Sequence, residues 1–385
     1  MSDKFIKSAS AGTFISLFAY GSLMCILHAC NNEIHRAFSL SSTQVGVLFT
    51  MLYFGYIPSA LLTGRFADLK GKIPCILAGV FLIIVSPVLF VLSKSYLCAM
   101  ASVFVMGLGA GAIDTNGLGF IGDLYTGKKR TAMISFTQVI FGVGALMGPY
   151  LVGVCLNKYS IYYPAFYFVA ASAVAGFVFM TASFRMKEEK PVAKTEEKAP
   201  LGIIFKDRYV YFILLAILLY CGSEFGFSGW VAVYFEKILK TTSALAAQSV
   251  SVFWIGITLG SMAFAFALKK ISQYKILFLA LLGVITGFLI FLVPYLFCAM
   301  AGTFMVGFCL GPVFPAIIAY GSNRYRDHSG LINSIILTFA NIAGIIFPIV
   351  IGLLADHTGI KCAMFTVLVL SLIHIFILKY YSKGK

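Results

Sequence analysis

The feature that most constrains this chain is a series of apolar stretches, each about as long as a membrane is thick. A helix needs about 20 predominantly apolar residues to cross the hydrocarbon core of a bilayer. The sequence holds such stretches at residues 9–30, 44–64, 73–93, 95–122, 132–155, 162–184, 209–235, 245–268, 275–293, 295–320, 329–353 and 361–379. We therefore expect an all-α membrane protein with twelve transmembrane helices.

The composition argues against a soluble protein. Of the 385 residues, 60% are hydrophobic and 11% are charged, whereas a soluble domain carries about 25% charged residues. The net charge of +15 would suggest nucleic-acid binding if the basic residues formed one patch on a soluble face. They lie between the apolar stretches instead, so we expect the lipid bilayer as a partner and no nucleic acid.

The basic residues also predict how the chain is oriented. If both termini are cytoplasmic, most of the 29 Lys and Arg fall in segments on the cytoplasmic side, as the positive-inside rule requires. An odd number of spans would destroy this alternation. The first apolar stretch continues to Cys30 without an obvious signal-peptide cleavage site, so we expect it to be retained as a span. We predict a multi-pass protein of the inner or plasma membrane with both termini in the cytoplasm.

One long polar segment divides the spans into two groups of six. Residues 185–208 carry mixed charges and two Pro, a composition that predicts a cytoplasmic linker. The linker would join an N-terminal six-helix bundle, residues 1–184, to a C-terminal six-helix bundle, residues 209–385. Residues 201–205 could also form a short amphipathic piece that lies on the membrane.

The two groups of spans resemble each other in sequence. Ser135 and Pro149 in the fifth span match Ser334 and Pro348 in the eleventh span at a constant offset of 199 residues. Parallel six-span repeats, with a binding site between them near the membrane midplane, are typical of one large class of transporter. Chance similarity between two Gly-rich helices is the alternative explanation.

The segment after the second span carries a motif of specific spacing. A Gly is followed by an acid four residues later, by a second Gly three residues beyond and then by a basic residue. This pattern resembles the signature of the major facilitator superfamily, at the place where that family keeps it. The segment contains Gly64, Arg65, Asp68, Gly71 and Lys72.

The resemblance covers the whole chain in span order and implies two pseudo-symmetric six-helix bundles. It also implies that this segment latches one conformation of an alternating-access cycle. We expect Gly to allow a tight turn there and Asp68 to cap the N-terminus of a neighbouring helix. Arg65 and Arg130 are the expected partners of opposite charge. A plain helix cap is the simpler reading of Asp68, and both readings can hold.

Two acids lie inside the apolar stretches, Asp114 in the fourth span and Glu224 in the seventh. An ionised carboxylate near the bilayer centre costs about 2.5–3.5 kcal/mol on insertion scales. Such residues normally face a cavity and handle protons or substrate. No Lys or Arg inside the spans can neutralise either acid. We therefore predict that these two carboxylates couple proton movement to transport and contact the substrate, with structural polar packing as the alternative.

The seventh span resembles that of sugar–proton symporters related to the fucose and glucose transporters. It reads Tyr220-Cys-Gly-Ser-Glu224, followed by Gly-Trp230 and Tyr234. The resemblance implies a substrate site that also includes Asn116, Gln138, Trp230 and Asn341. Asn116 follows the acid by two residues, whereas the family spacing is four, so it points to nearly the opposite side of its helix from Asp114. Trp230 would suit stacking on a sugar ring, or equally a membrane interface.

The sequence contains no motif of an enzyme or of a nucleotide-driven pump. GxSxG, GxxxxGK[ST] and HExxH are absent, and the nine Cys have no metal-ligand spacing. We expect no cofactor, no metal and a proton gradient as the energy source. The leading hypothesis is a monomeric, proton-coupled importer of a small polar solute, a sugar or a related metabolite. A proton-driven drug or metabolite exporter of the same fold is the alternative, and a non-transporting sensor or scaffold is a third class.

Overall fold

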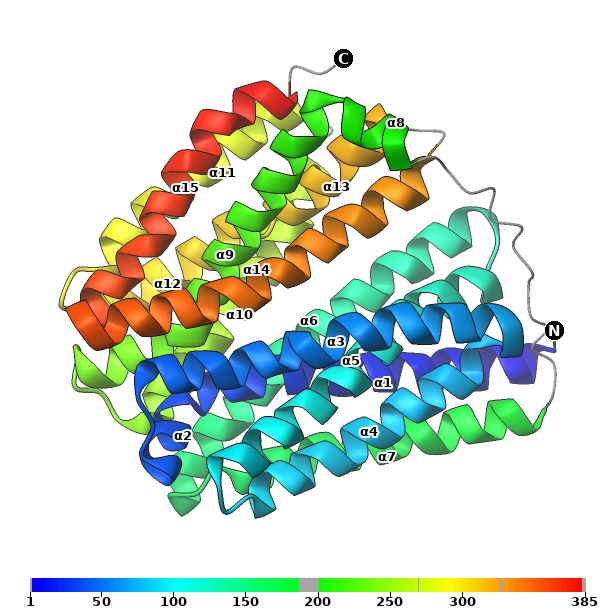
Figure 1. Cartoon of the computed structure of the whole chain (residues 1–385), viewed down its shortest axis with the longest axis horizontal. Helices are drawn as coiled ribbons and strands as arrows, with labels where there is room; N and C mark the ends of the chain where they lie inside the picture. The colour runs from blue at the N-terminus through cyan, green and yellow to red at the C-terminus, as the bar shows by residue number, and fades with distance from the viewer. Residues whose placement is uncertain (1, 187–200, 269, 326–327, 383–385) are drawn as a thin grey trace. The chain divides into compact units, whose positions relative to one another are not determined.

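The computed structural model describes residues 2–186, 201–268, 270–325 and 328–382. These residues form helices and connecting turns, with no strand among them (Figure 1). Twelve of the helical segments are long and apolar enough to cross a membrane. The prediction of an all-α protein with twelve spans is confirmed, and the chain is a multi-pass membrane protein.

Among the described residues, seven helices precede the linker. The short α2 leads from the first span to the second, and the other six helices are the predicted spans. They are α1 (Asp3–Ala29), α2 (Asn31–Phe38), α3 (Ser42–Lys70), α4 (Lys72–Leu92), α5 (Tyr96–Leu124), α6 (Gly127–Tyr159) and α7 (Tyr163–Arg185).

In the described part of the chain after residue 200 there are eight helices. One span is built from two helices, α12 and α13, which meet at Gly311 and Pro312, where proline has no N–H to donate. The helices are α8 (Leu201–Lys206), α9 (Arg208–Lys237), α10 (Ser243–Ala267), α11 (Gln273–Phe291), α12 (Leu296–Leu310), α13 (Val313–Arg324), α14 (Ser329–Thr358) and α15 (Ile360–Ser382). The helix α8 lies where an amphipathic piece was one interpretation of the linker, and residues 187–200 fall outside the described residues.

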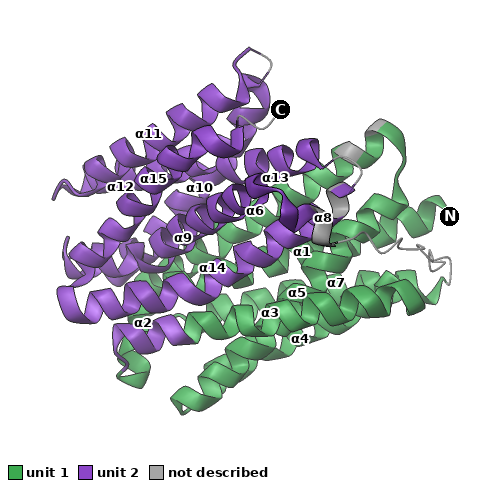
Figure 2. Cartoon of the chain, turned by 45° about the horizontal axis from the view of Figure 1, so that its top comes forward, with its two compact units in different colours: residues 1–39, 48–195 green, residues 40–47, 196–385 purple. Residues whose placement is uncertain are grey.

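The chain forms two compact units, which correspond closely to the two groups of six spans. Unit 1 contains residues 1–39 and 48–195, and unit 2 contains residues 40–47 and 196–385. Figure 2 shows that the first residues of α3 carry the colour of unit 2, whereas the rest of that helix belongs to unit 1. In each unit we call the end that carries a chain terminus the inner end, following the predicted orientation, and the opposite end the outer end.

Pairs of glycines let two helices in each unit pack with their backbones in contact. In unit 1, Gly107 and Gly111 of α5 lie against the backbone of α3 at Leu52 and Tyr56. A side chain as small as a methyl group would collide there with the carbonyl oxygens of α3. Small residues at helix contacts in membranes allow such close approach.

Unit 2 repeats this packing with a different pair of helices. Gly307 and Gly311 lie against the backbone of α10 at Phe253 and Ile257. These two glycines follow Gly107 and Gly111 at a constant offset of 200 residues. The internal repeat therefore extends from the fifth and eleventh spans to the fourth and tenth, and it is a repeat of packing as well as of sequence.

Candidate functional site

The acid of unit 1 is held by tyrosines. The hydroxyl of Tyr56 in α3 donates a hydrogen bond to the Asp114 carboxylate in α5, and Tyr20 in α1 is a second hydrogen-bonding partner of the same carboxylate. In the part of the chain that the structure describes, no Lys, Arg or His forms an ion pair with Asp114. A buried acid that is hydrogen-bonded but not ion-paired is able to take up and release a proton without leaving a cation unpaired.

The glycine contacts between α3 and α5 explain how Tyr56 reaches Asp114. A Cβ atom on Gly111 would lie 3.1 Å from the carbonyl carbon of Tyr56 and 3.1 Å from the nitrogen of Ala60. Asp114 follows Gly111 by three residues and so lies about one turn further along the same face of α5. The Gly-rich run before Asp114 therefore brings the two backbones close enough for the tyrosine hydroxyl to meet the carboxylate.

Asn116 has a separate set of partners. Its side-chain Nδ2 donates to Thr63 Oγ1 at 3.0 Å and to the carbonyl oxygen of Ala112 at 2.8 Å, and the residue is buried. Thr63 is two helical turns beyond Tyr56 on α3. Asp114 and Asn116 thus bond to different residues of the same helix, α3, rather than facing opposite sides of α5, and the donor of Asn116 is occupied within unit 1.

The acid of unit 2 also pairs with a tyrosine. Glu224 in α9 is buried, and its carboxylate is hydrogen-bonded by Tyr220 one turn earlier. The ring of Tyr220 lies 5.9 Å from the ring of Phe314 in α13, measured between centroids. Among the described residues, Glu224 has no ion-pair partner either.

The two tyrosine–carboxylate pairs are related by the internal repeat. Tyr220 corresponds to Tyr20, and Phe314 corresponds to Asp114, at the same offset of 200 residues as the glycines. Each unit thus keeps the tyrosine in its first span. The acid is in the fourth span of unit 1 but in the first span of unit 2, and an aromatic ring occupies the place where unit 1 has its acid.

Sequence reasoning did not identify Tyr20 or Tyr56, and it named Tyr220 as part of the seventh-span resemblance but not as a site residue. Tyrosine is common in this chain, with 20 copies, so its presence near an acid in the sequence carries little information. The repeat offset was the available signal, because it matches Tyr20 to Tyr220.

The remaining predicted substrate residues lie in three different settings. The ring of Trp230 in α9 is fully buried in unit 2, and its Nε1 has no hydrogen-bond partner among the described residues. Gln138 in α6 has an exposed side chain. Asn341 in α14 is partly buried and donates to the carbonyl oxygen of Leu337 at 2.8 Å. Their predicted roles in binding stay predictions.

The signature segment differs from the expected loop. The helix α3 continues through Gly64, Arg65 and Asp68 to Lys70, so only Gly71 lies between α3 and α4. The φ angle of Gly71 is 92°, a conformation that favours glycine. The tight turn expected of a glycine in this segment is therefore made by Gly71, because residues 65–70 continue the helix.

The charges around this turn also pair differently from the prediction. Lys72 forms an ion pair with Asp123 at the end of α5. Arg130 in α6 lies near Gly122. Within the described residues, Asp68 is exposed and has no hydrogen bond or ion pair to Arg65 or Arg130. Asp123 was not singled out from the sequence, because an acid at a span end has no distinctive pattern.

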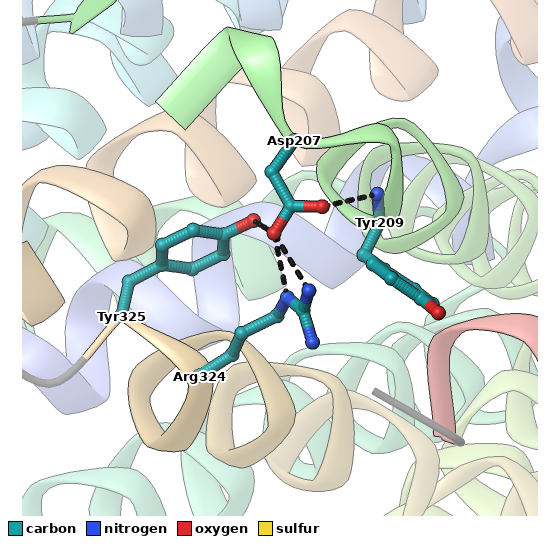
Figure 3. Close-up of polar contacts among 4 residues, drawn as sticks. All are labelled: Asp207, Tyr209, Arg324 and Tyr325. Carbon is teal, nitrogen blue, oxygen red and sulfur yellow. Dashed lines mark hydrogen bonds and ion pairs between the residues drawn. The ribbon is translucent and has the colours of Figure 1, made fainter. Parts of the chain in front are cut away.

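A polar cluster anchors the inner end of α9, the helix that carries Glu224 (Figure 3). Asp207 accepts hydrogen bonds from the backbone N–H of Tyr209 at 3.0 Å and from the Tyr325 hydroxyl at 2.8 Å. Arg324 donates to the same carboxylate from Nε at 2.8 Å, and its guanidinium lies 4.0 Å from the centre of the Tyr209 ring.

This cluster keeps Asp207 ionised. Burial alone would raise the pKa of Asp207, but the hydrogen bonds from Tyr209, Tyr325 and Arg324 outweigh it and hold the pKa below its ordinary value. A negative charge before the first turn of α9 also suits the helix dipole. Asp207 therefore serves as N-cap and ion-pair partner together, and it ties α9 to α13.

The described residues contain no group of three or more His, Cys, Asp or Glu side chains placed to hold a metal ion. All nine cysteines are free thiols.

Comparisons with known proteins agree with this architecture. The model of the Major Facilitator Superfamily matches residues 9–330 and 239–384. A Protein TsgA homolog of Buchnera aphidicola subsp. Schizaphis graminum is 26% identical, with 90% of each chain covered. A Protein TsgA homolog of Yersinia enterocolitica is 24% identical, with 97% of each covered.

Solved structures show the same fold. A bacterial homolog of the human lysosomal transporter Spinster, crystallised in an inward-facing and unoccupied conformation, has a TM-score of 0.78 at 14% identity, covering 100% of this chain and 99% of the other. A mutant of the nucleoside transporter NupG has a TM-score of 0.78 at 12% identity, covering 98% and 99%. At these identities the likeness concerns the fold.

Proposed function

The chain belongs to the major facilitator superfamily, and from that premise we propose that it is a proton-coupled transporter that takes up a small polar solute, a sugar or a related metabolite. Members of this family are membrane transporters that work by alternating access of a central site. The cargo and the coupling ion are the parts of this proposal that need support from the residues of this chain.

The observation that carries the proposal is the pair of carboxylates inside the spans, one in each unit, each bonded to tyrosine and, among the described residues, not to a cation. An acid in this environment is costly when ionised. Protonation lowers the free energy of such an acid when water is excluded, and the acid releases the proton when its environment becomes aqueous. Asp114 and Glu224 are therefore our proposed proton carriers.

The same residues offer hydrogen bonds to a hydroxylated solute. A neutral carboxyl group donates one hydrogen bond and accepts others, and tyrosine hydroxyls do both. We propose that solute contacts Asp114, Glu224 and Trp230, with Gln138 and Asn341 as further partners. Asn116 supports the site indirectly through its bonds to Thr63 and Ala112.

The proposed setting is the inner or plasma membrane, with both termini cytoplasmic and the chain acting as a monomer. Large apolar side chains are exposed on the spans, among them Leu62 and Phe376, and this pattern supports contact with lipid.

Two steps test the function. Purified protein is first screened by thermal unfolding against sugars, nucleosides and organic acids, because a ligand at one hundred times its dissociation constant stabilises the folded state by about 2.7 kcal/mol. A solute that raises the melting temperature is then added outside proteoliposomes that contain a pH-sensitive dye. Symport predicts acidification of the lumen that depends on the solute.

Asp114→Asn and Glu224→Gln keep the size and one acceptor oxygen of the side chains but cannot carry a proton. Each should abolish acidification while the solute still binds. Glu33→Gln is the matched control, because Glu33 is an acid of the short outer helix α2, paired with Arg36 and outside the spans. If both span variants acidify the lumen as fast as wild type, the proposed coupling is wrong.

A proton-driven exporter of organic cations is the second candidate. It is favoured by the tyrosines beside Asp114, because aromatic rings next to a carboxylate also suit a cation. The same vesicles distinguish the two functions: entry of solute in exchange for protons makes the lumen alkaline.

A further inference from the structure

A second copy of the signature spacing ends α14. Gly352, Asp356 and Gly359 are separated by four and three residues, as Gly64 and the two signature residues after it are in α3. The last glycine of each set has the same backbone conformation, with φ 83° and ψ 156° at Gly359 and φ 92° and ψ 164° at Gly71. Each is the single residue between two spans.

The two turns lie at opposite ends of the spans. The turn at Gly71 follows the second span, so it is at the inner end. The turn at Gly359 follows the eleventh span, so it is at the outer end. Asp68 and Asp356 thus occupy the same position in two turns of the same kind, which lie on opposite sides of the membrane.

Asp356 makes the interaction that was predicted for Asp68: it caps the N-terminus of a neighbouring helix. Its Oδ1 accepts from the backbone N–H of Ser42 at 2.8 Å, and its Oδ2 accepts from the N–H of Thr43 at 2.8 Å and from Thr43 Oγ1 at 2.6 Å. These donors form the first turn of α3, where the helix dipole favours a negative charge.

The rest of the first turn of α3 is capped locally. Gln44 N–H donates to Ser41 Oγ at 3.2 Å, and Ser41 N–H donates to Gln44 Oε1 at 2.8 Å, which is the reciprocal pattern of a capping box. The first three N–H groups of α3 are therefore all bonded, two of them by Asp356 alone.

Two glycines bring the helices close enough for this contact. A Cβ atom on Gly352 would lie 2.6 Å from the carbonyl oxygen of Ser42, and one on Gly46 would lie 2.8 Å from the carbonyl carbon of Pro348. The close packing explains why residues 40–47 belong to unit 2, as Figure 2 shows, although the rest of α3 belongs to unit 1.

We propose that the Gly352–Gly359 turn is an outer latch, closed here by Asp356 on the first turn of α3, and that it alternates with the inner latch at Asp68. Asp68 is exposed and without a hydrogen-bond or ion-pair partner among the described residues, so one latch is closed and the other open. The proposal rests on alternating access, which is part of the proposed function, but on neither the solute nor the proton.

Hydrogen–deuterium exchange of the full-length protein in nanodiscs tests the latch. Asp356→Asn removes the charge at the first turn of α3 and should raise exchange in residues 40–47 at least about tenfold. Exchange in residues 64–72 at the inner end should fall at the same time, because the population moves to the conformation in which the inner latch is closed. Glu33→Gln, at the outer end but away from this contact, is the matched control and should change neither segment.

Two milder variants keep the test valid if Asp356→Asn folds poorly. Thr43→Val removes one of the three hydrogen bonds, and Gly352→Ala separates the helices without touching a charge. Both variants should raise exchange in residues 40–47 and lower it in residues 64–72, as Asp356→Asn does, but by smaller amounts.

Two outcomes overturn the proposal. If residues 40–47 exchange as in wild type in all three variants, the contact does not hold α3. If those residues lose protection while residues 64–72 stay unchanged, Asp356 is a structural cap and not a latch. Because no solute is used, a failure of the vesicle experiment leaves this result standing, and a failed latch leaves solute-driven proton movement untouched.

Discussion

Substitution of Gly107 by Ala should disturb the site in unit 1, although Gly107 lies seven residues before Asp114 on α5. A Cβ atom at this position would lie 2.8 Å from the carbonyl carbon of Leu52 and 3.0 Å from the nitrogen of Tyr56, whereas ordinary contact begins at 3.4 Å. The closest collision is with the carbonyl oxygen of Leu52, and all of these are backbone atoms that cannot rotate away. The α3 and α5 helices must therefore separate, and the Tyr56 hydroxyl moves with α3 away from Asp114.

The expected cost follows from overpacking. Extra atoms in a well-packed core cost about 1–3 kcal/mol. At about 2 kcal/mol, with about 2–4 °C for each kcal/mol in a unit of this size, the melting temperature should fall by about 4–8 °C. Misplacing a catalytic group by about 1 Å can also cost about a hundredfold in rate, so solute-driven proton movement should fall more than binding.

Gly117→Ala is the matched control for this substitution. Gly117 lies in the same helix, but the nearest atom to an added Cβ, Thr13 Cγ2, is 3.4 Å away, which is ordinary contact. Both variants gain the same helix propensity, about 0.8–1.0 kcal/mol, so the difference between them isolates the collision. Thermal unfolding of the purified proteins measures that difference. If the two variants melt within one degree of each other, the backbone contact does not hold α3 against α5, and our account of how Tyr56 reaches Asp114 fails.

Two further predictions concern unit 2. Asp207→Asn should lower the free energy of unfolding by about 1 kcal/mol at neutral pH, because the charge-assisted hydrogen bonds of Asp207 are partly exposed. Since the pKa of Asp207 is lowered in the folded state, the stability difference between wild type and variant should be at its full size above about pH 4 and should shrink as the pH falls through that lowered pKa. Thermal unfolding of both proteins from pH 7 down to pH 3 measures this difference, and a difference that does not change with pH would count against the ion-pair cluster. Trp230→Phe should change the melting temperature little, because the removal of a buried N–H without a partner among the described residues offsets the cavity that the smaller ring leaves. It should also abolish the solute-induced stabilisation if Trp230 contacts solute, and a retained ligand shift would remove Trp230 from the proposed site.

Sequence reasoning could identify the two acids but not their partners. An acid inside an apolar stretch is conspicuous, since lipid makes its charge costly, and Asp114 and Glu224 needed no other signal. Tyrosine is too common in this chain to stand out near an acid. A contact such as that of Tyr56 with Asp114 also joins two helices and two residues far apart in the chain. Such a contact depends on which helices pack together and in what register.

The signature segment shows the same division. Its spacing correctly indicated the family, because the pattern and its place between two spans are both local in sequence. The spacing did not indicate which copy is engaged: Asp68 has no partner in the described part of the chain, whereas Asp356 caps α3 with three hydrogen bonds. Only the packing of α14 against the start of α3, through Gly46 and Gly352, decides that.

Local sequence patterns were enough to establish that this chain is a bundle of twelve membrane helices in two related groups. Hydropathy and loop charge act on each segment separately, because every span must satisfy the bilayer on its own. The tertiary structure alone decided which side chains meet inside the bundle. In lipid the packing of helices depends on small residues and close backbone contact, so the contact of Tyr56 with Asp114 and the outer cap on α3 follow from the positions of a few glycines.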